Sequence, residues 1–258
     1  MEIFYARVPK SASRSILRMV ENDPEFKTMQ HYKPSYGEWK YNPIPDYRPY
    51  FPIDNSPEDK KFSFSFVRNP WDRAVSCWRW VQKDFPTVAP RFYGDFYDFL
   101  SWLYEHTRTW GPLVPEECLL RSNGEWTPHN KKSQIIWDKN EIYKSTGPQV
   151  FYTSKLCNLD PNWNPTFTVA VDYIGRIENF RMDLENITKI TGFKFYDIPR
   201  INSSRPTLDD YTKYYNQRCL DLVCKIWPHD VFQLGYKFGT PATKKLLHCN
   251  ENFMEFIS

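Results

Sequence analysis

Near its amino terminus the chain reads IFYARVPKSASRS (residues 3–15), and this stretch predicts a β-strand that turns directly into a helix. The apolar run Ile3–Ala6 is typical of a buried strand, and Pro9 marks the turn that follows it. A helix that begins near Ser13 offers unpaired backbone N–H groups and the positive end of its dipole at this turn. Lys10 and several serine hydroxyls lie in the same few residues. The stretch therefore predicts a cradle for a phosphate group.

A second junction of this kind, FSFSFVRNPWDRAVS, lies at residues 62–76. Its alternating aromatic residues predict a strand that ends at Val67, and Pro70 suits the first turn of the helix that follows. Arg68 leaves the strand end, and Ser76 lies two turns into the helix. A guanidinium and a hydroxyl at this separation can hold a second phosphate group.

These two junctions resemble the 5′-phosphosulfate loop and the 3′-phosphate motif of the sulfotransferases that use 3′-phosphoadenosine 5′-phosphosulfate (PAPS). The spacing between Arg68 and Ser76 matches the pattern of that family. The stretch VDYIGRIENFRMDL at 171–184 is similar to a motif of the carbohydrate sulfotransferases, and RINSSRP at 200–206 resembles a later loop of the same family. The four motifs follow the family's order and span nearly the whole chain.

Strands that alternate with helices predict an α/β fold, a three-layer α/β/α sandwich with a mainly parallel central sheet, and the resemblance implies a sulfotransferase fold like that of the P-loop nucleoside triphosphatases. We expect strands at 2–7, near 26–31, at 62–67 and at 168–175, and helices at 14–22, 70–82, 93–104, 179–191 and 207–225. The last of these helices is expected to open at Thr207. The chain is expected to form one domain, 1–258, with an acceptor-side insertion at 84–150 and a tail at 240–258.

The resemblance also assigns roles to residues of the two junctions. Lys10 would stabilise the leaving phosphate, and the 5′ end of PAPS would be held by Lys10, Ser11, Ala12, Ser13, Arg14 and Ser15. The 3′-phosphate would be held by Arg68 and Ser76, with Arg205 closing over it from the 200–206 loop.

Three further side chains have two readings each. Tyr173 either packs on the adenine or belongs to the core. Arg14 stands where the family usually has a small hydroxyl residue, so its guanidinium either binds phosphate or points outward. Arg73 either braces a carboxylate or lines the site.

Two histidines compete for the role of general base. His31 follows the expected second strand and resembles the histidine that some carbohydrate sulfotransferases carry there; histidine readily takes a proton near neutral pH. His129 resembles the histidine of an "H…PQ" stretch of the same family, although no proline precedes Gln134. Because the transferred sulfuryl group carries less charge than a phosphoryl group, we expect no metal ion.

Composition limits the partners. With 34 basic and 31 acidic residues, the formal net charge of +3 is too small to indicate nucleic-acid binding. No apolar stretch reaches the roughly 20 residues of a membrane span, and the first strand leaves no room for a signal peptide, so we expect a cytoplasmic protein without a membrane partner. The six cysteines show no metal-ligand spacing, which favours reduced thiols.

The leading hypothesis is a sulfotransferase that moves a sulfuryl group from PAPS to a hydroxyl acceptor, a carbohydrate, and releases the 3′,5′-bisphosphate PAP. Trp102, Trp110 or Trp126 could stack on sugar rings, and core packing explains them equally well. One alternative is a P-loop-like nucleotide kinase, although the chain lacks the G-x-x-x-x-G-K-[ST] motif. Another is a non-catalytic module that binds a nucleotide or a glycan.

Overall fold

The computed structural model describes residues 2–21, 29–32, 61–86, 88, 95–107, 120–122, 125–127, 142, 145–159, 165–169, 171–195 and 210–239. Its strands are β1 (Glu2–Ala6), β2 (Met29–Tyr32), β3 (Lys61–Val67), β4 (Leu120–Ser122), β5 (Glu125–Thr127), β6 (Ser154–Leu159), β7 (Pro165–Val169) and β8 (Tyr173–Arg176). Its α-helices are α1 (Ser13–Glu21), α2 (Pro70–Asp84), α3 (Phe96–Thr107), α5 (Val150–Thr153), α6 (Phe180–Thr191), α7 (Gln217–Ile226) and α8 (Pro228–Gln233). Two short 3₁₀ helices are η5 (Ile177–Asn179) and η6 (Tyr211–Tyr214).

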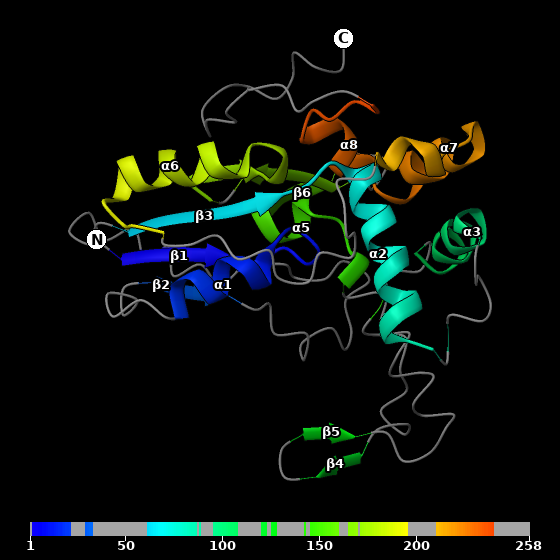
Figure 1. The fold of residues 1–258 in the computed structure, drawn as a ribbon, viewed down its shortest axis with the longest axis horizontal. Coiled ribbons are helices and arrows are strands. Elements are labelled where there is room, and N and C mark those ends of the chain that lie inside the picture. Colours follow the sequence, from blue (N-terminus) through cyan, green and yellow to red (C-terminus); the bar gives the residue numbers. More distant parts are fainter. Residues whose placement is uncertain are drawn as a thin grey trace.

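A parallel sheet with the strand order β2-β1-β3-β8 organises the described part of the chain. Its register pairs Ala6 of β1 with Tyr32 of β2 and with Ser65 of β3, and it pairs Val67 with Arg176 of β8. The carboxyl ends of all four strands therefore meet at one edge. In Figure 1 the arrowheads of β1 and β3 point toward α2, and α3, α7 and α8 gather beyond them.

Alternation along the strands divides the apolar side chains between two clusters. Phe62, Phe64 and Phe66 pack with Ile3 and Tyr5, with Ile16 and Leu17 of α1, and with Leu184 and Ile187 of α6. Val67, at the end of β3, joins instead a larger cluster built from α2, α3, α7 and α8. On the other face of β3, the Ser65 hydroxyl donates a hydrogen bond to the Ala6 carbonyl, 2.7 Å away. The sheet thus lies against two packed clusters.

Close packing between β3 and β8 requires glycine at position 175. A Cβ built on Gly175 would lie 2.5 Å from Cε1 of Phe66, a residue that is fully buried and pairs with Gly175 across the strands. Any larger side chain would push the Phe66 ring out of the core. The glycine of the 171–184 stretch thus serves the packing of the sheet.

Helix α2 begins as its sequence predicts. Pro70 occupies its first turn, and the Asn69 side chain accepts hydrogen bonds from the backbone N–H groups of Trp71 and Asp72, at 3.0 and 3.3 Å. Since Asn69 follows Arg68 directly, this cap fixes the point where the chain leaves β3.

Most of the expected elements are confirmed, and two need correction. The expected strand at 168–175 is two strands, because the chain bends at Val171 and Asp172, where Asp172 bonds to Ser63 of β3; β7 pairs with β6, and only β8 joins the main sheet. The expected helix at 207–225 begins only at Gln217, capped by Asn216. Asp210 caps the separate turn η6, and the extended residues at 215 and 216 interrupt the helix. Thr207 lies outside the described residues.

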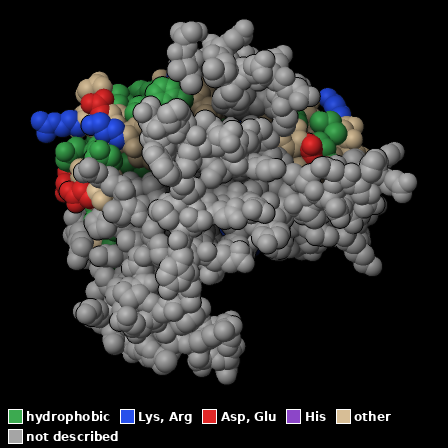
Figure 2. All heavy atoms as spheres, turned by 180° about the vertical axis from the view of Figure 1, so that it is seen from behind, with side chains coloured by type: hydrophobic (Ala, Val, Ile, Leu, Met, Phe, Trp, Pro, Cys, Tyr) green, Lys and Arg blue, Asp and Glu red, His purple; other side chains and the backbone are tan. Residues whose placement is uncertain are grey.

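The α/β class is confirmed, whereas the three-layer sandwich, the P-loop-like detail and the single domain stay predictions. Among the described residues, no helix has both the length and the apolar character needed to cross a membrane. The same residues contain no group of His, Cys, Asp and Glu side chains suited to a metal ion. On the face seen in Figure 2, the coloured side chains include basic and acidic groups close together, in keeping with the mixed charge of the sequence.

Candidate functional site

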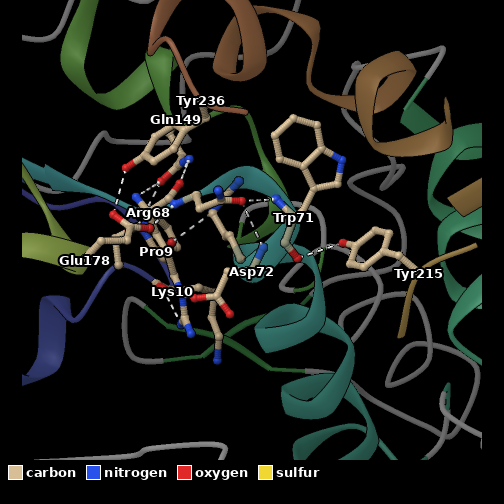
Figure 3. A network of polar contacts seen from close by, with 12 residues as sticks. Pro9, Lys10, Arg68, Trp71, Asp72, Gln149, Glu178, Tyr215 and Tyr236 are labelled. Atoms are coloured by element: carbon tan, nitrogen blue, oxygen red, sulfur yellow. Dashed lines mark hydrogen bonds and ion pairs between the residues drawn. The ribbon is translucent and has the colours of Figure 1, made fainter. Parts of the chain in front are cut away.

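The two predicted phosphate sites lie side by side at the carboxyl edge of the sheet. The loop after β1 carries Lys10, and the end of β3 carries Arg68; Nη1 of Arg68 lies 3.4 Å from the Lys10 carbonyl oxygen, to which it donates. Figure 3 shows both residues in one polar network with Glu178 from beyond β8 and Gln149 from before α5. Both junctions can therefore face one ligand.

The loop between β1 and α1 has a left-handed backbone at two residues that are not glycine. Lys10 has φ 64° and Ala12 has φ 55°, a conformation that costs about 1–2 kcal/mol per residue. The surrounding contacts maintain it: Ser11 N–H reaches the Val8 carbonyl at 3.4 Å, and Ile16 N–H donates to the Ala12 carbonyl at 3.1 Å. Backbone strain of this kind is concentrated at functional sites, because it shapes a loop for its ligand.

The serines of this loop are buried, which changes the role expected for one of them. Ser11, Ser13 and Ser15 are at most 7% exposed. The Ser11 hydroxyl donates to Oε1 of Gln149 at 3.0 Å, so its proton is committed inside the protein. Ser11 therefore fixes the shape of the loop, and backbone N–H groups at the start of α1 are among the donors that this loop can offer. Arg14 is exposed, so the structure places its side chain at the surface.

Lys10 places a positive charge at this loop. Its ammonium lies 4.7 Å from the centroid of the Trp80 ring, and within the described part of the chain it forms no ion pair. The pKa of Lys10 is lowered to about 8, mainly by burial, and the guanidinium groups of Arg68 and Arg14 contribute to this decrease. A group in this state gains from a nearby anion, because the anion stabilises its charged form.

The Arg68 side chain is oriented by a carboxylate one helical turn away. Its Nε donates to Oδ2 of Asp72 at 2.6 Å, in an ion pair whose side chains are 18% and 15% exposed. Asn69 N–H donates to Oε1 of Glu178 at 2.6 Å, which ties the end of β3 to the segment after β8. Asp72 thereby holds the guanidinium while part of it stays open to solvent.

Ser76 is buried at 4% exposure and lies four residues after Asp72 on α2. Residues with this spacing share one face of a helix, so Asp72, Ser76 and Trp80 form a row along α2. Arg68 bonds to Asp72 and the Lys10 ammonium lies over Trp80. The row therefore runs between the two cations, and the prediction that Ser76 helps to hold a phosphate there stays a prediction.

Arg73 forms an ion pair with a buried carboxylate, which is one of the two roles predicted for it. It is 1% exposed, and its Nη1 lies 3.6 Å from Oδ2 of the fully buried Asp230. Its Nε donates to the Pro9 carbonyl at 3.3 Å, and its Nη2 donates to the carbonyls of Ser145 and Gly147 at 3.1 and 2.7 Å. Arg73 thus anchors, from inside the protein, residues 9–12 of the loop between β1 and α1, called the 9–12 loop below.

Tyr173 belongs to the core, which corrects the expectation that it packs on the adenine. Its side chain is 7% exposed among the aromatic residues of the sheet, and its hydroxyl donates to Oδ1 of Asp183 at 2.8 Å. A ring enclosed in this way offers no free face for stacking. Trp102 is likewise a core residue at 8% exposure.

The candidate bases are only partly placed. His31 lies inside β2, paired with Tyr5, and not after the strand as expected; it stands one residue before the carboxyl end of β2, and its side chain lies outside the described part. His129, Arg205 and Trp110 also lie outside the described residues.

Gln149 and Asp230 join the two junctions, and the sequence reasoning missed both. Gln149 is fully buried and contacts Ser11 and Arg68. The sequence carries a signal for it, because Pro148 precedes Gln149 directly and so forms the Pro-Gln pair that is absent at Gln134. No signal marked Asp230, which resembles any other acidic residue early in a helix.

A comparison with known families covers both of these junctions. The sequence profile of the sulfotransferase family matches residues 1–237, nearly the whole chain. Comparisons with curated proteins and with solved structures give no match. Because the match covers far more than half of the chain, this protein belongs to the sulfotransferase family.

Proposed function

We propose that this sulfotransferase takes its sulfuryl group from PAPS and transfers it to a hydroxyl group of a carbohydrate. The observation that carries the proposal is the contact between its two cationic junctions: the Arg68 guanidinium reaches the Lys10 carbonyl at 3.4 Å. A nucleotide with phosphate groups at both its 5′ and 3′ ends needs two such junctions close together.

The charge of the site suits this donor. Lys10 and Arg68 bring two positive charges to the site, and the exposed Arg14 adds a third beside it. Of these three, among the described residues only Arg68 pairs with a carboxylate, that of Asp72. The remaining charge favours an anion. The left-handed backbone at Lys10 and Ala12 turns the loop at the start of α1, where N–H groups are available to a 5′-phosphate.

The 3′-phosphate distinguishes PAPS from most other adenine nucleotides. We assign it to Arg68 and Ser76, with Arg205 as a further contact. A guanidinium held by Asp72 at one edge still offers N–H groups at its other edge, and it binds phosphate oxygens through two parallel hydrogen bonds.

When bound, PAPS supplies an activated sulfuryl group. The protein has to orient the acceptor hydroxyl, remove its proton and stabilise negative charge on the departing phosphate. Lys10 is our candidate for the last task, because its ammonium lies at the loop proposed to hold the 5′-phosphate, and His31 is our candidate for taking the proton. Ser11, Arg73 and Gln149 keep the loop in shape. The carbohydrate acceptor rests on the resemblance of residues 171–184 to the carbohydrate sulfotransferases.

The test is a binding and transfer experiment with purified protein. Wild type is titrated with PAP, 5′-AMP and ATP with magnesium, and it is then incubated with sulfur-35-labelled PAPS and a panel of glycans. We expect PAP to bind more tightly than 5′-AMP, and label to appear in a glycan. Magnesium-dependent ATP binding in place of PAP binding would favour a kinase, whereas PAP binding without transfer to any acceptor would favour a non-catalytic module.

Arg68→Ala tests the assignment of the 3′-phosphate. It should weaken PAP binding by about tenfold or more and weaken 5′-AMP binding less, because the loss of the hydrogen bond to the Lys10 carbonyl affects both nucleotides, whereas the loss of the 3′-phosphate contact affects PAP alone. Arg181→Ala is the control, since Arg181 is exposed on α6. An equal loss of affinity for both nucleotides would contradict the assignment.

A further inference from the structure

Gln149 uses one side-chain amide to contact both candidate phosphate sites. Its Oε1 accepts hydrogen bonds from the Ser11 hydroxyl at 3.0 Å and from Arg68 N–H at 2.8 Å. Its Nε2 donates to the Arg68 carbonyl at 2.7 Å. The residue is fully buried, so water does not compete for these bonds. In Figure 3 the Gln149 amide lies beside Arg68 within the network that also contains Lys10.

Gln149 is itself held in place by a buried ion pair. Its N–H donates to Oδ2 of Asp230 at 2.8 Å, and Val150 N–H donates to Oδ1 of Asp230 at 3.0 Å. Asp230 pairs with Arg73, whose Nε reaches the Pro9 carbonyl. Asp230 and Arg73 thus connect Gln149 to the 9–12 loop a second time, in addition to the hydrogen bond from Ser11.

We propose that Gln149 is a positioning residue that sets the spacing between the 9–12 loop and Arg68, and hence between the pockets for the two phosphate groups of PAP. The inference rests on the proposed function and adds to it a residue that need not touch the nucleotide. Glutamine suits the task, because a single amide both donates and accepts. Asparagine has the same amide on a shorter side chain, and leucine fills a similar volume with no hydrogen bond.

A positioning role for Gln149 can be distinguished from a general loss of protein stability by its effect on nucleotide affinities. A bisphosphate gains its affinity by reaching two pockets at once, so its binding depends on the distance between them. A nucleotide with one phosphate uses one pocket and can settle there whatever the position of the other. Loss of the spacing should therefore weaken PAP more than either 5′-AMP or 3′-AMP.

The experiment measures the affinities of the full chain for PAP, 5′-AMP and 3′-AMP by calorimetry. The variants are Gln149→Leu and Gln149→Asn, the second serving if the first does not fold. Thr153→Val is the matched control, since it removes a buried hydrogen bond of 3.3 Å to the Gln149 carbonyl and leaves the amide in place. Thermal unfolding of each variant confirms that the titrated protein is folded.

We expect both Gln149 variants to lose about tenfold or more in affinity for PAP, with a smaller loss for each mononucleotide, and the control to behave as wild type. Equal losses for PAP and for one mononucleotide would overturn the inference, because Gln149 would then serve one pocket alone. Unchanged PAP affinity would also overturn it. Failure of wild type to bind PAP is a separate result, which would remove the proposed function and the inference that rests on it.

Discussion

At the scale of single residues, Lys10 shows how its surroundings prepare a side chain for an anion. Partial burial removes water from its ammonium, and two guanidinium groups nearby, Arg68 and Arg14, oppose its charge, so that its pKa falls to about 8. The unfolded chain keeps this proton up to about pH 10.5, the ordinary value. Between pH 8 and pH 10.5 the unfolded state therefore binds more protons than the folded state, and the contribution of Lys10 to the free energy of unfolding rises with pH.

Nucleotide binding should show the opposite dependence on pH. A bound phosphate favours the charged form of Lys10, so the affinity for PAP should be full below pH 8 and should fall as the pH rises through about 8. Titrations from pH 7 to pH 9.5 would measure the slope. Lys10→Met should bind more weakly with little slope over this range, and a slope that persists in this variant would assign the titration to another group.

At the scale of elements, the junction between β1 and α1 is held in a backbone conformation that its residues disfavour. Ala12 has φ 55°, which glycine adopts without cost. Ala12→Gly should therefore leave the free energy of unfolding within about 1 kcal/mol of wild type or raise it. Ala74→Gly is the control, because Ala74 is fully buried inside α2 and should lose at least about 1 kcal/mol. Urea unfolding measures the unfolding free energy of both variants. A larger loss of unfolding free energy for Ala12→Gly than for Ala74→Gly would contradict the inference that Ala12 is strained.

The buried pair of Arg73 and Asp230 joins α2 to α8 and to the 9–12 loop. Arg73→Met leaves the Asp230 carboxylate buried without its cation, and the loss should be about 3–5 kcal/mol of unfolding free energy. Burial already raises the pKa of Asp230, and removal of the Arg73 cation should raise it further. Asp230 of the variant should therefore be protonated at low pH, and the difference in unfolding free energy between variant and wild type should become smaller there. Lys83→Met, exposed in the last turn of α2, should cost little. A small, pH-independent effect at position 73 would show that the pair is not coupled to folding.

The sequence predicted the two junctions but not the link between them, for a physical reason. A strand end followed by Pro70, or by Lys10 and serines, has a local signature, because capping and dipole effects act within a few residues. Gln149 bonds to Arg68 across 81 positions of the chain, and such contacts depend on the folded arrangement. Tyr173 was ambiguous for a related reason, since an aromatic residue on a strand fits a core and a binding surface equally well.

At the scale of the whole molecule, the site combines segments that are far apart in the sequence. The 9–12 loop, the end of β3, the start of α5 and α8 meet at one edge of the sheet through Arg73, Gln149 and Asp230. A nucleotide that spans both junctions would therefore stabilise elements from both ends of the chain. Stabilisation by a ligand grows with its concentration relative to its dissociation constant, so PAP should raise the melting temperature more than an equal concentration of 5′-AMP.

Hydrogen exchange locates this effect along the chain. Saturating PAP should slow amide exchange in residues 8–16 and 66–78 together, because its two phosphate groups hold both junctions, whereas 5′-AMP should protect mainly the first segment. The last turn of α6, residues 188–191, lies about two turns beyond the start of the helix at this edge, so it should exchange at the same rate with and without ligand and is the internal control. Protection by PAP of only one of the two segments would mean that the junctions, though adjacent, do not hold one nucleotide.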